Sequence, residues 1–217
     1  LHCYGGYGGA EPKELTGDQW IEDYKDLVKS GVFFLNISGG EPTMHPDFIQ
    51  IIRFLKKTNF PFILTTNGVF SNKLREELLL ARDVILGLKF SLDGPTAKSH
   101  TSLRRVKNGT RNFKIFEVTL NNIRYFAKHG FPITIATCLH KDNINLLDEM
   151  VGLIEKLKPV SWFVSTITPS GRAIKNHEIF VSDNAVDKIK WRQIRKRLEE
   201  KDISLRYIDM PYAEDYN

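Results

Sequence analysis

The clearest fold signal in this chain is the stretch Leu86-Gly87-Leu88-Lys89-Phe90-Ser91-Leu92-Asp93. Apolar and polar side chains alternate along it, so the leucines and Phe90 fall on one face of a strand, whereas Lys89, Ser91 and Asp93 fall on the other. A parallel strand that helices cover on both faces would instead be almost continuously apolar. The polar face therefore indicates a curved sheet whose concave side lines a polar cavity.

Strands and helices alternate on either side of this stretch. The alternation favours parallel pairing through right-handed crossovers over an antiparallel sheet with one face in water. At about 30 residues or somewhat more per unit, the chain holds about six units, too few for an eight-unit barrel. A partial barrel and an open doubly wound sheet remain, and the polar strand faces favour the partial barrel. Strands are predicted over 32–38, 61–66, 84–92, 133–139, 162–168 and 204–208, helices over 16–29, 46–57, 71–81, 113–129, 146–158 and 183–201, and a long loop over 96–110.

Composition excludes several classes of protein. The chain has 217 residues, 41% hydrophobic and 26% charged, which is typical of a globular domain. No apolar run approaches the ~20 residues of a membrane-spanning helix, so no membrane partner is expected. Two cysteines exclude a disulfide scaffold and predict a cytoplasmic protein. The net charge of +5 is too small to indicate a nucleic-acid partner.

Glycine-containing motifs follow the predicted strands. They are expected at one edge of the sheet, where parallel α/β proteins bind ligands. Each motif alone is typical of a turn, but together they indicate a ligand-binding rim. The most specific is Gly39-Gly40-Glu41-Pro42, in which the glycines free the backbone to face a ligand and Glu41 offers a carboxylate to a cationic group such as an amine. The others are 65–68, 91–95 and 168–173.

In order and spacing, these motifs and Leu1-His2-Cys3-Tyr4 resemble the radical S-adenosylmethionine (SAM) superfamily, most closely its subgroup with C-terminal SPASM or Twitch cluster domains. The resemblance extends from residue 1 to about residue 173. It implies a partial (β/α)6 barrel over 1–217 that lacks the family's first strand in this chain, with 183–217 forming a terminal helix and a possible strand. A domain with auxiliary clusters is expected beyond Asn217.

The resemblance also implies the cofactors. The family signature is Cys-x-x-x-Cys-x-aromatic-Cys, and Cys3 matches the third cysteine, with His2 in the aromatic position. The first two cysteines are expected upstream of Leu1. Three thiolates would hold a [4Fe–4S] cluster and leave one iron open for SAM. A reductant such as a flavodoxin or ferredoxin would drive cleavage of SAM to a 5′-deoxyadenosyl radical, which abstracts hydrogen from a peptide, a protein or a peptide-derived cofactor precursor.

Individual roles follow from the same resemblance. Gly39, Gly40, Glu41 and Pro42 match the segment that binds the SAM amino group. The strand that carries Ser91 and Asp93 matches the one facing the ribose, and Asn67 lies on the adjoining rim. Arg104, with Arg105 as a rival, matches the arginine that pairs with the SAM carboxylate. Tyr4 is expected to pack over the cluster or adenine or to anchor its loop, and 168–173 is expected near the adenine. No single catalytic residue is predicted.

Three further expectations concern single residues. Glu41→Ala is expected to weaken SAM binding with little loss of stability, because a rim carboxylate is expected to be exposed. Cys138 is predicted to be a small buried residue rather than a ligand. His140 is predicted to bond to its own loop, with contact to substrate as the alternative.

Two other classes of function stay open at this point. One is a phosphate-binding α/β enzyme without a cluster, which would use the glycine-rich rim and the basic charge. The other is a partner-binding barrel without radical chemistry.

Overall fold

The computed structural model describes residues 14–104, 110–167, 170–181 and 186–208. Its described strands form one six-stranded sheet in the order β1-β2-β3-β4-β5-β6, and every neighbouring pair is parallel. Strands adjacent in sequence are therefore adjacent in space, which confirms the predicted α/β partial barrel. The strands are β1 (Leu35–Ile37), β2 (Phe62–Thr66), β3 (Ile85–Ser91), β4 (Ile133–Leu139), β5 (Ser161–Thr166) and β6 (Ser204–Ile208).

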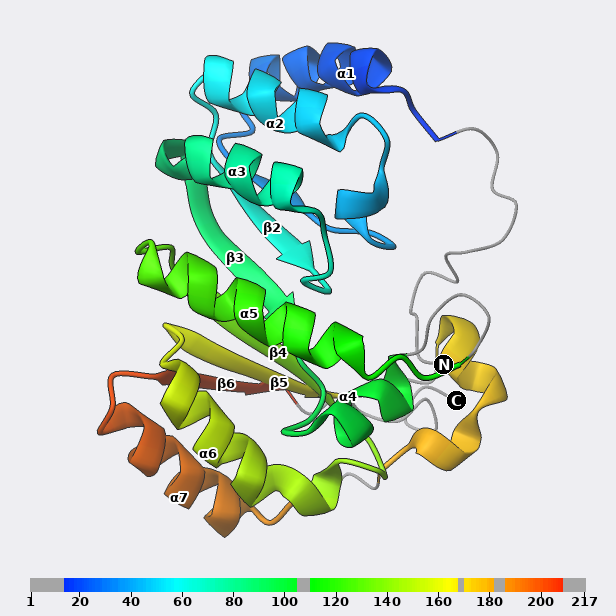
Figure 1. Ribbon diagram of the computed structural model, residues 1–217, viewed down its shortest axis with the longest axis vertical. Coiled ribbons are helices and arrows are strands. Elements are labelled where there is room, and N and C mark those ends of the chain that lie inside the picture. Colours follow the sequence, from blue (N-terminus) through cyan, green and yellow to red (C-terminus); the bar gives the residue numbers. More distant parts are fainter. Residues whose placement is uncertain (1–13, 105–109, 168–169, 182–185, 209–217) are drawn as a thin grey trace.

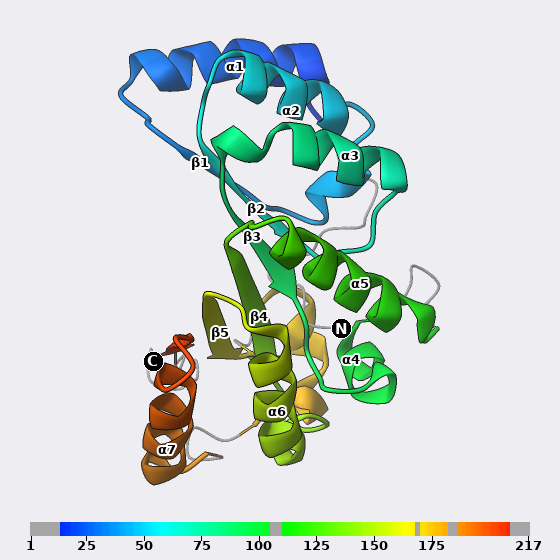
Figure 2. The ribbon, with the colours of Figure 1, turned by 60° about the vertical axis from the view of Figure 1, so that its left-hand side comes forward.

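The helices pack on the outer face of the curved sheet (Figures 1 and 2). Within the described ranges, no helix is both long and apolar enough to cross a bilayer. The α-helices are α1 (Gly17–Lys29), α2 (Phe48–Lys57), α3 (Asn72–Leu80), α4 (Ala97–Leu103), α5 (Lys114–Lys128), α6 (Leu147–Leu157) and α7 (Lys188–Glu199). Short 3₁₀ turns are η1 (Pro42–Met44), η2 (Arg82–Val84), η3 (Ile144–Leu146), η4 (Gly171–Lys175) and η5 (His177–Ile179).

The core lies between the sheet and these helices. Alternate strand residues such as Leu88, Phe90 and Trp162 point into it and are at most 1% exposed. Each fully buried side chain of this size contributes about 1.5–3 kcal/mol to folding. The apolar face of α2 completes the packing with Phe48, Ile51, Ile52 and Leu55, all buried. The apolar faces that the sequence predicts are thus the faces that pack.

The other face of the sheet carries half-buried or exposed side chains. In the parallel register, Lys89 lies between Thr65 of β2 and Thr134 of β4, and Ser91 lies beside Ala136. This arrangement confirms the predicted polar concave face. It also brings the ends of the strands, with their polar residues, to one edge of the sheet (Figure 1).

The structure corrects the predicted face of Leu86, which is 50% exposed and does not join Leu88 and Phe90 in the core. The register between β2 and β3 shifts by one residue at this point, with Ile85 opposite Phe62 and Gly87 opposite Ile63. Such a bulge leaves its extra residue unpaired and turns it away from the regular alternation. Strict alternation therefore begins only after the bulge.

Two other predictions of secondary structure were also wrong. The first strand begins at Leu35 rather than at residue 32, and Phe33 before it is 76% exposed. The stretch 96–110, predicted as a loop, contains helix α4. Thr96 and Ser99 form a capping box at its start, which compensates for the weak helix propensity of its serine, threonine and histidine residues.

Gly68, after β2, supplies a direct test of this packing. Its φ is +80°, and an added Cβ would lie 2.9 Å from Cδ1 of Phe90 and 3.0 Å from Cγ2 of Thr119. We expect Gly68→Ala to lower the free energy of unfolding by about 1–3 kcal/mol, measured by urea denaturation.

Gly152→Ala is the matched control for this change. Gly152 lies inside α6, and its added Cβ would meet no atom within 4 Å. Alanine there should stabilise the protein by about 0.5–1 kcal/mol. Equal effects at the two glycines would contradict the described packing of the Gly68 turn.

Candidate functional site

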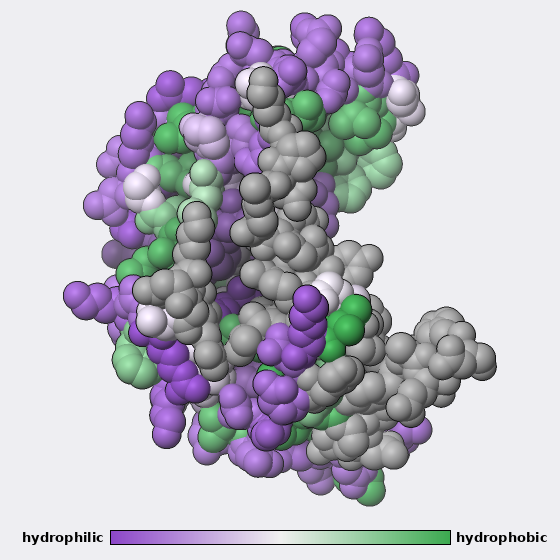
Figure 3. All heavy atoms as spheres, turned by 90° about the vertical axis from the view of Figure 1, so that its right-hand side faces the viewer, coloured by the Kyte–Doolittle hydropathy of each residue, from purple (hydrophilic) through white to green (hydrophobic). Residues whose placement is uncertain are grey.

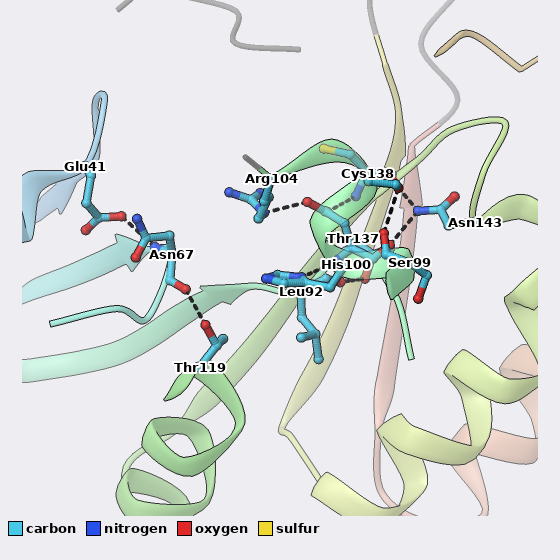
Figure 4. Close-up of polar contacts among 12 residues, drawn as sticks. Glu41, Asn67, Leu92, Ser99, His100, Arg104, Thr119, Thr137, Cys138 and Asn143 are labelled. Carbon is cyan, nitrogen blue, oxygen red and sulfur yellow. Dashed lines mark hydrogen bonds and ion pairs between the residues drawn. The ribbon is translucent and has the colours of Figure 1, made fainter. Parts of the chain in front are cut away.

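The carboxyl ends of β1 to β4 bring the predicted site residues to one edge. Figure 4 shows two groups of contacts there: Glu41 and Asn67 lie on one side, and His100, Arg104 and Asn143 lie on the other. Figure 3 shows the side of the molecule that is on the right in Figure 1, where many of the coloured residues are hydrophilic. Tyr4, Cys3, Arg105, Thr168 and Pro169 lie outside the described residues.

Glu41 connects the first two strand ends. It is half-buried, and its carboxylate accepts four hydrogen bonds. Oε1 accepts from Oγ1 of Thr43 and from Oγ1 of Thr66, both at 2.7 Å, and Oε2 accepts from the backbone N–H of Asn67 at 2.6 Å. The expectation of an exposed rim carboxylate was therefore wrong. Glu41 holds the diglycine loop against the end of β2.

The Asn67-Gly68 turn is held by α5 behind it. Oγ1 of Thr119 donates to the Asn67 carbonyl at 2.9 Å, and Nδ2 of Asn122 donates to the Gly68 carbonyl at 2.7 Å. The Asn67 side chain closes its own turn by accepting from the N–H of Val69 at 2.7 Å. Asn67 thus lies on the rim as predicted, with its Oδ1 used inside the protein.

The diglycine loop leaves its backbone accessible. Gly39 and Gly40 are exposed, and Pro42 begins η1 directly after Glu41. Gly39 has a φ of +136°, which disfavours other residues, and an added Cβ would meet no atom within 4 Å. An exposed backbone with open space beside Gly39 fits the close approach of a ligand's amino group.

Asp93 is the most buried charged residue of the site, with 0% exposure. Its Oδ1 accepts from the backbone N–H of Cys138 at 2.9 Å, and its Oδ2 lies 2.5 Å from Nε of Arg104. A carboxylate out of water at this depth requires such partners. Asp93 and Arg104, which were assigned separate contacts with SAM by resemblance, are thus paired with each other.

His100 on α4 supports the same strand end. Its Nδ1 accepts from the backbone N–H of Asp93 at 3.2 Å, and burial lowers the pKa of His100 to about 4. The imidazole is therefore neutral at pH 7, as an accepting Nδ1 requires. The ring fixes the position of Asp93 rather than supplying charge.

Asn143 is a residue that the sequence analysis missed. Its Nδ2 donates to the carbonyls of Asp93 and Cys138, both at 2.8 Å, and its Oδ1 accepts from the N–H of His140 at 2.8 Å. It therefore clamps the ends of β3 and β4 together. An asparagine in the loop after a strand gives no signal of this role, because its partner on β3, Asp93, is 50 residues away in the sequence.

Cys138 and His140 do not join in a metal site. Cys138 packs against a small apolar cluster that includes Leu103 and Ile179, and burial raises the pKa of its thiol to about 11. Nδ1 of His140 accepts from the N–H of Asp142 at 3.2 Å, in agreement with the predicted bond to its own loop. Among the residues that the structure describes, no three His, Cys, Asp or Glu side chains group as metal ligands.

Proteins of known function are similar in sequence to this chain. The AdoMet-dependent heme synthase of Methanosarcina barkeri is 30% identical over 184 residues, which cover 84% of this chain and 51% of that protein. The mycofactocin maturase MftC of Mycobacterium tuberculosis is 30% identical over 173 residues, which cover 79% of this chain and 42% of that protein. The chain therefore spans about half the length of these curated relatives.

Solved structures share the fold. SuiB of Streptococcus suis, bound to precursor peptide SuiA, superposes with a TM-score of 0.74 at 16% identity, over 95% of this chain and 45% of that chain. The enzyme anSMEcpe with bound AdoMet and Kp18Cys peptide gives a TM-score of 0.72 at 15% identity, over 94% of this chain and 59% of that chain. At these identities the likeness shows the fold alone.

The family itself is shown by sequence. Residues 1–154, more than half of the chain, match the sequence model of the Radical SAM superfamily. The cofactors of that family are a [4Fe–4S] cluster and SAM. The ends of β1 to β4 described above lie within residues 1–154. We conclude that this chain belongs to the radical SAM superfamily.

Proposed function

We propose that this chain is the catalytic barrel of an enzyme that cleaves SAM reductively and abstracts hydrogen from a peptide or a peptide-derived precursor. The observation that carries the proposal is the open diglycine backbone beside the polar strand ends, within a chain of this family. Peptide substrates are favoured by the relatives, which include a mycofactocin maturase and a PqqA peptide cyclase. A C-terminal SPASM-type domain and a flavodoxin or ferredoxin as reductant belong to the same proposal.

The SAM site would use the strand ends in sequence order. The backbone of Gly39 and Gly40 would accept hydrogen bonds from the SAM amino group, and Pro42 would fix the exit of that loop. Ser91, half-buried on the concave face, would meet the ribose. Asn67 would border the ligand through its side-chain Nδ2, because its Oδ1 and both of its backbone polar groups already form the hydrogen bonds described above.

Arg104 would bind the SAM carboxylate while Asp93 orients it. The ion pair with Asp93 uses Nε of Arg104, and the arginine side chain keeps 21% exposure. The terminal guanidinium nitrogens are the atoms suited to a carboxylate. Asp93 would therefore act on SAM indirectly, by holding the arginine in place.

Cys3 would provide one thiolate ligand of the cluster, and Tyr4 would pack beside it or over the adenine. The chemistry that a bound [4Fe–4S] cluster supplies is a single electron for the cleavage of SAM into methionine and a 5′-deoxyadenosyl radical. The apolar packing around Cys138 would help to exclude water from that edge of the barrel. A dry site protects a reactive intermediate from side reactions.

Anaerobic reconstitution tests this proposal. We expect the full-length protein, loaded with iron and sulfide and reduced with dithionite, to form 5′-deoxyadenosine from SAM, measured by chromatography. Cys3→Ala should abolish the product because it removes a cluster ligand. Cys138→Ala is the matched control and should retain it, because Cys138 packs without grouping as a metal ligand. A fully loaded protein that binds SAM without cleaving it would exclude the proposal and favour a binding role.

Glu41 provides a second test, at the diglycine loop. Because its carboxylate accepts four hydrogen bonds, we expect Glu41→Ala to lower the free energy of unfolding by about 1–3 kcal/mol and to weaken SAM binding. Denaturant unfolding and SAM titration measure the two effects.

The exposed Glu76 of α3 is the matched control for Glu41. Glu76→Ala should change stability by no more than about 0.5 kcal/mol and leave SAM binding unaltered. If both variants unfolded at the same denaturant concentration, the structural role of Glu41 would be refuted.

A further inference from the structure

The concave face of the sheet carries positive charge that the proposed SAM site does not use. Among the described side chains that alternate onto this face from the strands, the titratable ones are Lys89 of β3, Cys138 of β4 and Arg206 of β6. The raised pKa of Cys138 leaves its thiol neutral. The carboxylate of Asp93, at the rim, is paired with Arg104. The face therefore carries two cations with no strand carboxylate among the described residues.

Lys89 is held in an unusual position for a lysine. Its side chain is half-buried, and its Nζ lies 4.0 Å from the centroid of the Phe163 ring. None of the ion pairs found among the described residues involves Lys89. Burial is the main cause that lowers the pKa of Lys89, and the charge of Arg206 lowers it further. A cation–π contact offsets part of the cost of burying an ammonium group, but it does not neutralise the charge.

Arg206 lies on β6, the strand next to that of Phe163. It is paired in register with Phe163 across β5 and β6, and it is exposed. Lys89 and Arg206 thus both lie next to Phe163 on the concave face. An anion placed between them would offset both the desolvation of Lys89 and the repulsion between the two charges.

We propose that Lys89, Phe163 and Arg206 form a subsite that binds a carboxylate group of the substrate. The inference rests on the proposed function, because it assigns the concave face to the substrate. Ser91, the predicted ribose contact, follows Lys89 by two residues on the same face, which is about 7 Å along a strand. The subsite thus lies next to the SAM site and deeper in the barrel.

The surroundings favour a carboxylate over a phosphate. Protein phosphate sites draw on backbone N–H groups at helix N-termini or glycine-rich turns. Lys89 and Phe163 lie within strands whose backbone groups pair with their neighbours on both sides. The donors available here are therefore side-chain donors, and the planar guanidinium of Arg206 matches the two oxygens of a carboxylate.

Glutarate, a simple dicarboxylate, is a suitable probe. We would label lysine with ¹³C at Cε in the complete reconstituted protein, assign the Lys89 signal with Lys89→Met, and titrate glutarate by NMR. We expect a saturable shift of the Lys89 signal and a rise of its pKa toward the ordinary lysine value. Glutaramide, the neutral analogue, should cause no shift. Saturating SAM should leave glutarate bound, because the two sites are separate.

Variants complete the test. Arg206→Gln should weaken glutarate binding about tenfold. The exposed Lys128 is the matched control, and Lys128→Met should leave binding unchanged. The inference is overturned by a shift that does not saturate, by an equal response to glutaramide, by glycerol phosphate binding as tightly as glutarate, or by SAM displacing glutarate. Formation of 5′-deoxyadenosine, assayed on the same samples, shows independently whether the proposed function holds.

Discussion

A buried carboxylate at the end of β3 organises the functional edge of this protein. Asp93 has no exposed surface, yet it contacts the backbone of β4 through Cys138 and the side chain of Arg104 after α4. Breaking a buried pair of this kind by removing one partner typically costs about 3–5 kcal/mol, because the other charge stays buried. His100 and Asn143 bind the backbone of Asp93 from two further elements. The side chain and the backbone of Asp93 therefore connect the end of β3 to β4, to α4 and to the loop after β4.

The division of the sheet into two faces explains how the same strands serve both folding and chemistry. One set of alternate residues, such as Leu88 and Phe90, packs under the helices and supplies the stability. The other set, which includes Lys89 and Ser91, contributes little to the core and is available to ligands. A curved sheet with helices on its outer face thus separates the requirements of packing from those of binding (Figure 2).

The fold could be predicted from the sequence because the periodicity of apolar residues and the order of the motifs can be read along the chain without knowledge of distant contacts. The pattern of the sequence predicted every strand of the sheet, and it placed Glu41, Asn67 and Asp93 on one rim. It could not predict which residues those side chains contact. Two partners of Glu41, Thr66 and Asn67, are 25 and 26 residues away, and Cys138, a partner of Asp93, is 45 residues away. The bulge at Leu86 could not be predicted for a similar reason, because a register shift depends on the neighbouring strand.

We propose that SAM binds across the carboxyl ends of these strands, with its amino group on the diglycine loop. A crystal structure of the reconstituted protein with SAM tests it most directly. We predict hydrogen bonds from the SAM amino group to the backbone of Gly39 or Gly40 and contact between the SAM carboxylate and Arg104. If SAM were bound elsewhere and the diglycine loop faced solvent, this proposed binding mode would be refuted.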